Sequence, residues 1–317
     1  MQWTLSRILR SLLTLLLLAS FTFFALSLSA DPALQILGPD AQPEIVQAFK
    51  ERWHLNDSLW QRYVTYIMGI IQLDFGLSYR TGAPAIDIVM TRLPATLALM
   101  IPTGIASLLI GIPVGIYAAL RQGTRTDRLI MTASVVGFAV PNFLVGILLM
   151  YLFSVWLGWL TPSGIISWMS WIMPMITMVS AEAGIFARFT RSAMVEILSH
   201  PMLDTSLAGG LNEHQGLRHH VLPNALIPLL TLVGLFAGNL IGGAVITENI
   251  FAWPGLGRLL VESVAARDFA VVQIIVLLIG ASMILINLLV DLSYGFIDPR
   301  IRDTRRISIK RNKVATA

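Results

Sequence analysis

Residues 11–30 read SLLTLLLLASFTFFALSLSA and carry no charged side chain. About 20 apolar residues in a helix cross the hydrocarbon core of a bilayer, which is ~30 Å thick. A secretory signal peptide is the alternative interpretation, because Arg7 and Arg10 precede the run and SLSA ends it. The apolar region of a signal peptide usually has only about 7–15 residues, however. The run therefore predicts a retained membrane-spanning helix.

Similar apolar runs recur along the rest of the chain. They cover residues 97–120, 133–157, 171–188, 227–247 and 271–291. The composition agrees, since 56% of the residues are hydrophobic and 13% are charged, whereas soluble domains have about 45–50% and about 25%. The sequence predicts an all-α polytopic membrane protein with about six transmembrane helices.

The charged residues divide the chain into four parts. Residues 1–30 form the N-terminus and the first span, and residues 31–94 form an extramembrane segment rich in charges and tryptophan. Residues 95–297 form a core of five helices that contains a long loop, 189–226. Residues 298–317 form a basic tail, which we interpret as an anchor against anionic lipid headgroups.

The positions of lysine and arginine predict the orientation. Most of the 22 basic residues fall at the N-terminus, in the loops after the second and fourth spans, and in the tail. Basic residues near span ends resist translocation, whereas a long segment such as 31–94 crosses with little regard to its charge. Both termini are therefore predicted to be cytoplasmic.

Several kinds of chemistry are excluded by residues that the sequence lacks. A phosphate-binding loop needs lysine after glycine, but Lys50, Lys310 and Lys313 are the only lysines and none follows glycine. There is no cysteine, and neither a His-Glu-x-x-His nor a Gly-x-Ser-x-Gly motif occurs. The net charge of +4 is small and scattered, so nucleic acid is not an expected partner. We expect no catalysis, cofactor or metal site in this chain.

Few polar residues fall within the predicted spans. Glu182 lies in the fourth, Glu248 falls near the end of the fifth, and Asn142 follows Pro141 in the third. An uncompensated charge inside a bilayer is costly, so these residues are predicted to line a translocation path. The alternative is a structural role for each, with Pro141 as a simple kink. A proton-coupled carrier would be expected to have more such residues.

The loop after the fourth span has the pattern of a surface helix. Its apolar residues Met202, Leu203, Leu207 and Leu211 recur at near-helical spacing, and Gly209-Gly210 offers a helix stop. Such a helix suits docking into a groove of another protein. The alternative is a helix that rests on lipid headgroups.

The same loop carries a family resemblance. Gly210, followed by His220-Val221-Leu222-Pro223, resembles the EAA loop of the permease subunits of ABC importers, in the form seen in the dipeptide, oligopeptide and nickel systems. Further motifs similar to that family are Asp74-Phe75-Gly76, Arg92-Leu93-Pro94-Ala95-Thr96, Gly111-Ile112-Pro113-Val114-Gly115, Leu157-Gly158-Trp159-Leu160, Thr190-Arg191-Ser192, Phe251 to Arg258, Ala266-Arg267-Asp268 and Asp298-Pro299-Arg300. Their order extends over about residues 5–302.

This resemblance implies an importer of peptides or chelated nickel in a bacterial inner membrane. The chain would be a permease subunit with a type I importer fold, and it would work with a second permease, two ATPase subunits that bind ATP and Mg²⁺, and a periplasmic solute-binding protein. The runner-up function is a channel or proton-coupled carrier that acts without ATPases.

The resemblance also implies which residues couple this chain to an ATPase. They are Leu203, Asp204, Leu207, Ala208, Gly210 and Leu211. Asp204, Leu207 and Gly209 replace residues that are commonly basic in the family, so the cognate ATPase is expected to have a less acidic groove. Weakened coupling is the alternative.

Two further groups of residues have competing interpretations. Trp253, Pro254 and Gly255 lie just outside the fifth span, where they are predicted either to form a periplasmic gate or binding-protein contact, or simply to belong to the aromatic belt of the membrane. His219 and His220 could suggest nickel ligands, but both are predicted to be cytoplasmic and are not expected to bind metal.

Overall fold

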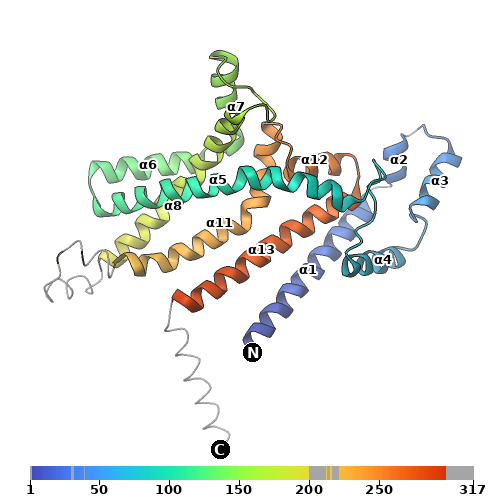
Figure 1. Cartoon of the computed structure of the whole chain (residues 1–317), viewed down its shortest axis with the longest axis horizontal. Helices are drawn as coiled ribbons and strands as arrows, with labels where there is room; N and C mark the ends of the chain where they lie inside the picture. The colour runs from blue at the N-terminus through green and yellow to red at the C-terminus, as the bar shows by residue number, and fades with distance from the viewer. Residues whose placement is uncertain are drawn as a thin grey trace, which may run out of the picture. The chain divides into compact units, whose positions relative to one another are not determined.

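The computed structural model describes residues 2–29, 32–38, 40–199, 212, 215 and 221–297 (Figure 1). Helices make up 81% of the structure, and no strand occurs in those ranges. In chain order the helices are α1 (Gln2–Ser29), α2 (Pro32–Leu37), α3 (Pro43–Arg52), α4 (Leu59–Gln72), α5 (Ala85–Leu120), α6 (Arg125–Ala139), α7 (Asn142–Met150), the π-helix η1 (Tyr151–Trp156), the 3-10 helix η2 (Trp168–Trp171), α8 (Ile172–Leu198), α11 (Leu222–Ile250), α12 (Leu256–Ala265) and α13 (Phe269–Ile297).

Among the residues that the structure describes, four uninterrupted helical segments are long and apolar enough to cross a membrane. They are Arg7–Leu28, Ala85–Leu120, Trp168–Leu198 and Phe269–Val290. Two bent pairs also pass this test, Arg125–Ala139 with Asn142–Trp156 and Pro228–Asn239 with Gly242–Ile250, which raises the number of spans to as many as six. The prediction of an all-α polytopic membrane protein is confirmed.

The third predicted span differs from a straight helix. Arg125–Ala139 and Asn142–Trp156 meet at 91°, with the break at Val140 and Pro141. Proline lacks an N–H and disfavours helical geometry in the residue before it, and Val140 is accordingly extended, with φ −77° and ψ 123°. The kink expected at Pro141 is thus a sharp corner between two helices.

The chain forms two compact units, each made from three stretches. The first unit comprises Met1–Met100, Met150–Pro174 and Ile241–Ile284, and the second comprises Ile101–Leu149, Met175–Leu240 and Leu285–Ala317.

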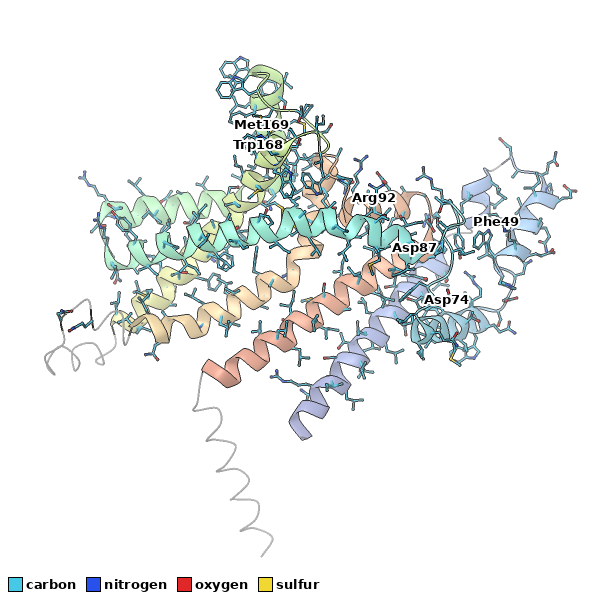
Figure 2. The ribbon with its side chains drawn as sticks, viewed as in Figure 1. Phe49, Asp74, Asp87, Arg92, Trp168 and Met169 are labelled. Atoms are coloured by element: carbon cyan, nitrogen blue, oxygen red, sulfur yellow. The ribbon has the colours of Figure 1, made fainter. Side chains whose placement is uncertain are left out.

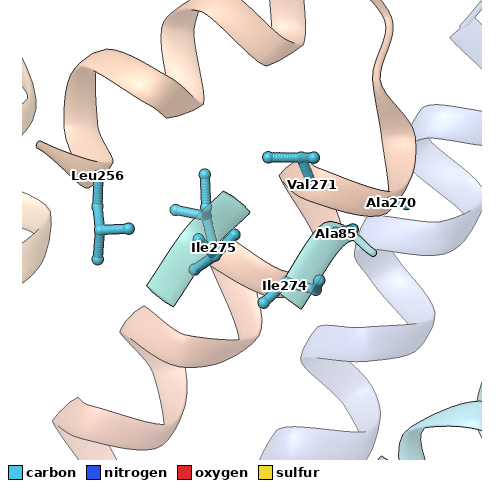
Figure 3. Packing of buried hydrophobic residues seen from close by; sticks show 7 residues of the cluster. Ala85, Leu256, Ala270, Val271, Ile274 and Ile275 are labelled. Atoms are coloured by element: carbon cyan, nitrogen blue, oxygen red, sulfur yellow. The ribbon is translucent and has the colours of Figure 1, made fainter. Parts of the chain in front are cut away.

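The core of the first unit lies where α5, α12 and α13 meet. Figure 3 shows its buried members, which are Ala85, Val89, Leu256, Ala270, Val271, Ile274 and Ile275. In the same unit α1 and α4 pack against each other (Figure 1), with the Phe23 and Tyr66 rings stacked at 5.4 Å. Helix α1 also packs against α13, where a Cβ added to Gly280 would clash with the Leu18 side chain.

Small residues bring three helices of the second unit together. On α5, a Cβ added to Gly115 would lie 2.5 Å from the carbonyl oxygen of Ala187 on α8. On the next side of α8, a Cβ on Gly184 would lie 2.7 Å from the carbonyl oxygen of Ser134 on α6. Close backbone approach at small residues is the usual packing device of membrane helices, so α8 is held tightly on two of its faces.

Candidate functional site

The turn between α11 and α12, residues 251–258, is held by a buried tryptophan. The Trp253 side chain is 0% exposed, and its indole Nε1 donates a hydrogen bond of 2.8 Å to the carbonyl oxygen of Ala95 on α5. The Trp171 ring meets it edge to face, with 5.0 Å between the ring centroids. The turn is therefore fixed to α5 and to η2 within the first unit.

A carboxylate closes the same turn from inside. Glu248 is 0% exposed; its Oε1 accepts from the Thr96 hydroxyl at 2.7 Å. Its Oε2 accepts from the backbone N–H groups of Gly257 at 2.7 Å and Arg258 at 3.1 Å. These are two of the free N–H groups at the start of α12, where the helix dipole favours negative charge. Glu248 thus caps α12 from a different helix.

Glycine is required where the carboxylate approaches the backbone. A Cβ on Gly255 would clash with the Glu248 carboxylate, and a Cβ on Gly257 would lie 2.5 Å from the Cα of Val245. Both glycines therefore serve close packing of the turn against the end of α11.

The chain that precedes α5, in the predicted extramembrane segment, is attached to the start of α13. Asp268 is 4% exposed and accepts hydrogen bonds from the Ser78 hydroxyl and from the Tyr79 N–H, the latter at 3.1 Å. The Tyr79 ring packs edge-on to Phe269 with centroids 6.0 Å apart, and burial raises the pKa of its phenol. This contact orders the chain that leads into α5, whose first turns carry Asp87 and Arg92 (Figure 2).

The residues expected at a gate occupy different depths in this turn. Pro254 is partly exposed, whereas Trp253 and Gly255 are buried. Of these three residues, only Pro254 has surface available for contact with another protein. The assignment of the turn to a gate or a binding-protein contact stays a prediction.

The residues expected along a path also differ in their surroundings. Glu248 has no exposed surface, so in this structure it faces the interior of the turn and no open path. Glu182 and Asn142 are both partly exposed. Glu182 lies on α8 directly before Ala183 and Gly184, which pack against α5 and α6. Within the described residues, no hydrogen bond or ion pair reaches its carboxylate.

The second unit contains an ion pair whose acidic member is buried. Arg191 on α8 donates from Nε and Nη2 to the two carboxylate oxygens of Asp127 on α6, at 2.6 and 2.7 Å. The Asp127 side chain is 3% exposed and that of Arg191 is 26% exposed. Asp127 also accepts from the N–H of Gly123 at 2.9 Å. The pair joins the first turn of α6 to α8 shortly before the long loop begins.

An apolar cluster holds both ends of that loop. Its buried members are Ala119, Met194, Val221 and Ala225. They come from the end of α5, the end of α8 and the start of α11. The proposed coupling residues themselves, Leu203, Asp204, Leu207, Ala208, Gly210 and Leu211, lie outside the described residues, as do His219 and His220.

Two of these contacts involve residues that the sequence does not single out. Thr96 stands out only as part of the motif Arg92-Leu93-Pro94-Ala95-Thr96, and no motif contains Asp127. Asp127 had one usable signal, since it is the single acid among Arg121, Arg125 and Arg128. An acid among basic residues near a span end is a candidate for a buried ion pair.

Almost the whole chain is similar to known membrane transport proteins. Residues 1–100 match the N-terminal family of binding-protein-dependent transport system membrane components, and residues 111–303 match the binding-protein-dependent transport system inner membrane component family. The glutathione transport system permease protein GsiC of Salmonella paratyphi A is 41% identical, with 95% of this chain and 99% of that protein covered. The GsiC protein of Escherichia coli K12 is 39% identical over the same shares.

The fold also resembles a solved transporter. A chain of the MetNI methionine ABC transporter, in an inward-facing conformation, aligns with a TM-score of 0.58 at 20% identity, covering 68% of this chain and 98% of that one. The chain belongs to the binding-protein-dependent transport system inner membrane components, as an ABC importer permease of the dipeptide and oligopeptide group.

Proposed function

We propose that this permease imports short peptides with the size and charge of glutathione. The observation that carries this proposal is the 41% identity over 95% of the chain to a permease named for glutathione transport. Dipeptides and slightly longer peptides share its backbone amides and terminal charges and are the next candidates. Chelated nickel is the remaining candidate from the family resemblance.

The importer would contain three kinds of partner subunit. A second permease would complete the path, two ATPase subunits would bind ATP and Mg²⁺, and a periplasmic solute-binding protein would deliver the peptide. The family to which the chain belongs supports this assembly, since its transport systems depend on a binding protein. ATP hydrolysis would take place on the separate ATPase subunits.

Coupling would pass through the loop after α8. Residues Leu203 to Leu211 would seat in an ATPase groove, and their motion would reach the membrane through the ends of α8 and α11. The cluster around Met194 and Val221 supports this, because it packs both ends of the loop on α5. The Asp127–Arg191 pair supports it as well, since it ties α8 to α6 close to the same point. A displacement of the loop by the ATPase would then move α5, α6, α8 and α11 together.

Alternating access needs a path and an outer closure. Glu182 and Asn142 would line the path between this subunit and the second permease, since both are partly exposed. The turn around Trp253 would form part of the outer closure, because its network to Thr96 and Ala95 makes it rigid. This scheme places both termini in the cytoplasm, as the basic residues predict.

Reconstitution tests the proposal. The complete transporter would be placed in liposomes with ATP inside and binding protein outside, and uptake of labelled glutathione, a dipeptide and a nickel chelate would be compared. We expect ATP-dependent uptake of glutathione or the dipeptide. Uptake of the nickel chelate alone would reject the peptide assignment. Uptake without ATP, or purification without nucleotide-binding subunits, would favour a channel or proton-coupled carrier.

A further inference from the structure

Residues 129–181 contain no charged side chain. This stretch includes the connection between η1 and α8, which we call the tryptophan loop, residues 156–171. Its tryptophans are Trp156, Trp159, Trp168 and Trp171. A connection that projects into water normally carries charged or strongly polar residues, as residues 31–94 do here. Its composition therefore does not fit an aqueous loop.

Apolar side chains of the tryptophan loop are largely uncovered. Trp156 is 73% exposed, Ile166 73% and Trp168 71%, and Trp159 is exposed as well. Figure 2 shows Trp168 and Met169 on the segment that leads into α8. So many exposed apolar side chains in one short segment indicate a surface that is covered in the membrane or in an assembly.

The backbone of the tryptophan loop is bonded internally. The Trp159 N–H donates to the carbonyl oxygen of Phe153 at 2.9 Å. The Ser170 hydroxyl accepts from the N–H groups of Ile166 at 3.1 Å and Ser167 at 3.3 Å. Backbone that enters a membrane must satisfy its polar groups in this way, because little water is available there.

The loop is also attached to the turn around Trp253. The N–H of Gly164 donates to the carbonyl oxygen of Phe251 at 2.9 Å, and Trp171 packs edge-on to Trp253. The position of the loop thus bears directly on the position of that turn.

We propose that the tryptophan loop lies in the headgroup–acyl boundary of the outer leaflet and anchors the turn at residues 251–258 to the bilayer. Tryptophan prefers this boundary, because its ring is apolar and its N–H is polar. A transient protein partner is a poorer occupant, since such interfaces have a polar rim and the loop has no charge to contribute. The choice of leaflet rests on the proposed orientation, but insertion into lipid does not depend on transport.

Spin labelling tests this directly, because the chain has no cysteine. Single variants Trp159→Cys and Trp168→Cys would be labelled in the assembled transporter in lipid bilayers. Collision rates with oxygen, which concentrates in lipid, and with a water-soluble nickel complex would be measured. Leu17→Cys, at an exposed position of the candidate span Arg7–Leu28, is the control expected in lipid. Asn56→Cys, at an exposed position of the predicted extramembrane segment, is the control expected in water.

We expect the oxygen-to-nickel ratio at both tryptophan positions to be several-fold higher than at Asn56 and close to that at Leu17. A ratio like that of Asn56 would overturn the proposal in favour of an aqueous loop. Low collision rates with both reagents would overturn it in favour of a protein partner. If a cysteine variant fails to assemble, quenching of native fluorescence by brominated phospholipid serves instead. That quenching should fall in Trp168→Phe and stay unchanged in Trp53→Phe.

Discussion

The hydroxyl of Thr96 joins α5 to α11 by a hydrogen bond of 2.7 Å to Glu248, 152 positions further along the chain. The same oxygen accepts the N–H of Leu256 at 2.7 Å. One hydroxyl therefore donates to the carboxylate and accepts from the first residue of α12, which fixes both helices relative to the turn between them.

Replacing Thr96 with valine tests this junction. Valine keeps the shape but leaves the Leu256 N–H and one Glu248 oxygen without their partner, and each buried unsatisfied group costs about 1–3 kcal/mol. We expect a lower unfolding temperature for the detergent-purified permease. Thr91→Val is the matched control, because Thr91 is an exposed residue of the same helix and should have little effect. Equal unfolding temperatures for Thr96→Val and Thr91→Val would show that the hydrogen bonds of Thr96 do not contribute to the stability of the permease.

The sequence predicted the membrane-spanning architecture because that signal is local. Twenty apolar residues without charge identify a span wherever they occur, and the break at Pro141 follows from its missing N–H. The size of the bend, 91°, did not follow, because the packing of other helices decides how far a break opens.

The site contacts could not be predicted in the same way. Thr96 and Glu248 meet only through folding, and nothing in either local sequence names the other as a partner. Glu248 was expected to line a path because a carboxylate near a span end has to be compensated. The sequence does not reveal that backbone N–H groups at the start of α12 supply that compensation.

The Asp127–Arg191 pair is predicted to contribute to stability. Removing one member of a buried pair costs about 3–5 kcal/mol, since the other charge is left unpaired; partial exposure of Arg191 favours the lower end. We expect Asp127→Ala to lower the unfolding temperature clearly, and Asp127→Ala with Arg191→Ala to recover part of the loss. A double-mutant cycle measures this coupling. Arg188→Ala is the control, since Arg188 is exposed on the same helix. Strict additivity of the two changes would contradict the prediction.

Gly255→Ala and Gly243→Ala should differ in their effects on stability and transport. A Cβ on Gly255 meets the Glu248 carboxylate, whereas a Cβ on Gly243 meets nothing within 4 Å. Overpacking typically costs about 1–3 kcal/mol, while alanine in a helix gains about 0.5–1 kcal/mol over glycine. We expect Gly255→Ala to lower the unfolding temperature and peptide uptake, and Gly243→Ala to preserve both. If Gly255→Ala left the unfolding temperature and peptide uptake unchanged, the prediction would be wrong, because the turn would then accommodate the added methyl group.

Leu207 provides the test of the proposed coupling loop. If its side chain enters an apolar part of an ATPase groove, Leu207→Asp buries an unpaired charge there and weakens docking. A loss of about 1.4 kcal/mol corresponds to a tenfold change in an equilibrium constant, so we expect about tenfold less ATP hydrolysis stimulated by the binding protein. Leu207→Met keeps the volume and apolar character and should retain stimulation. Both variants should fold equally well, which equal yields and equal unfolding temperatures of the isolated permease would verify. Normal stimulation in Leu207→Asp would remove Leu207 from the docking surface, and with it the explanation offered for the replacement of a basic residue at this position.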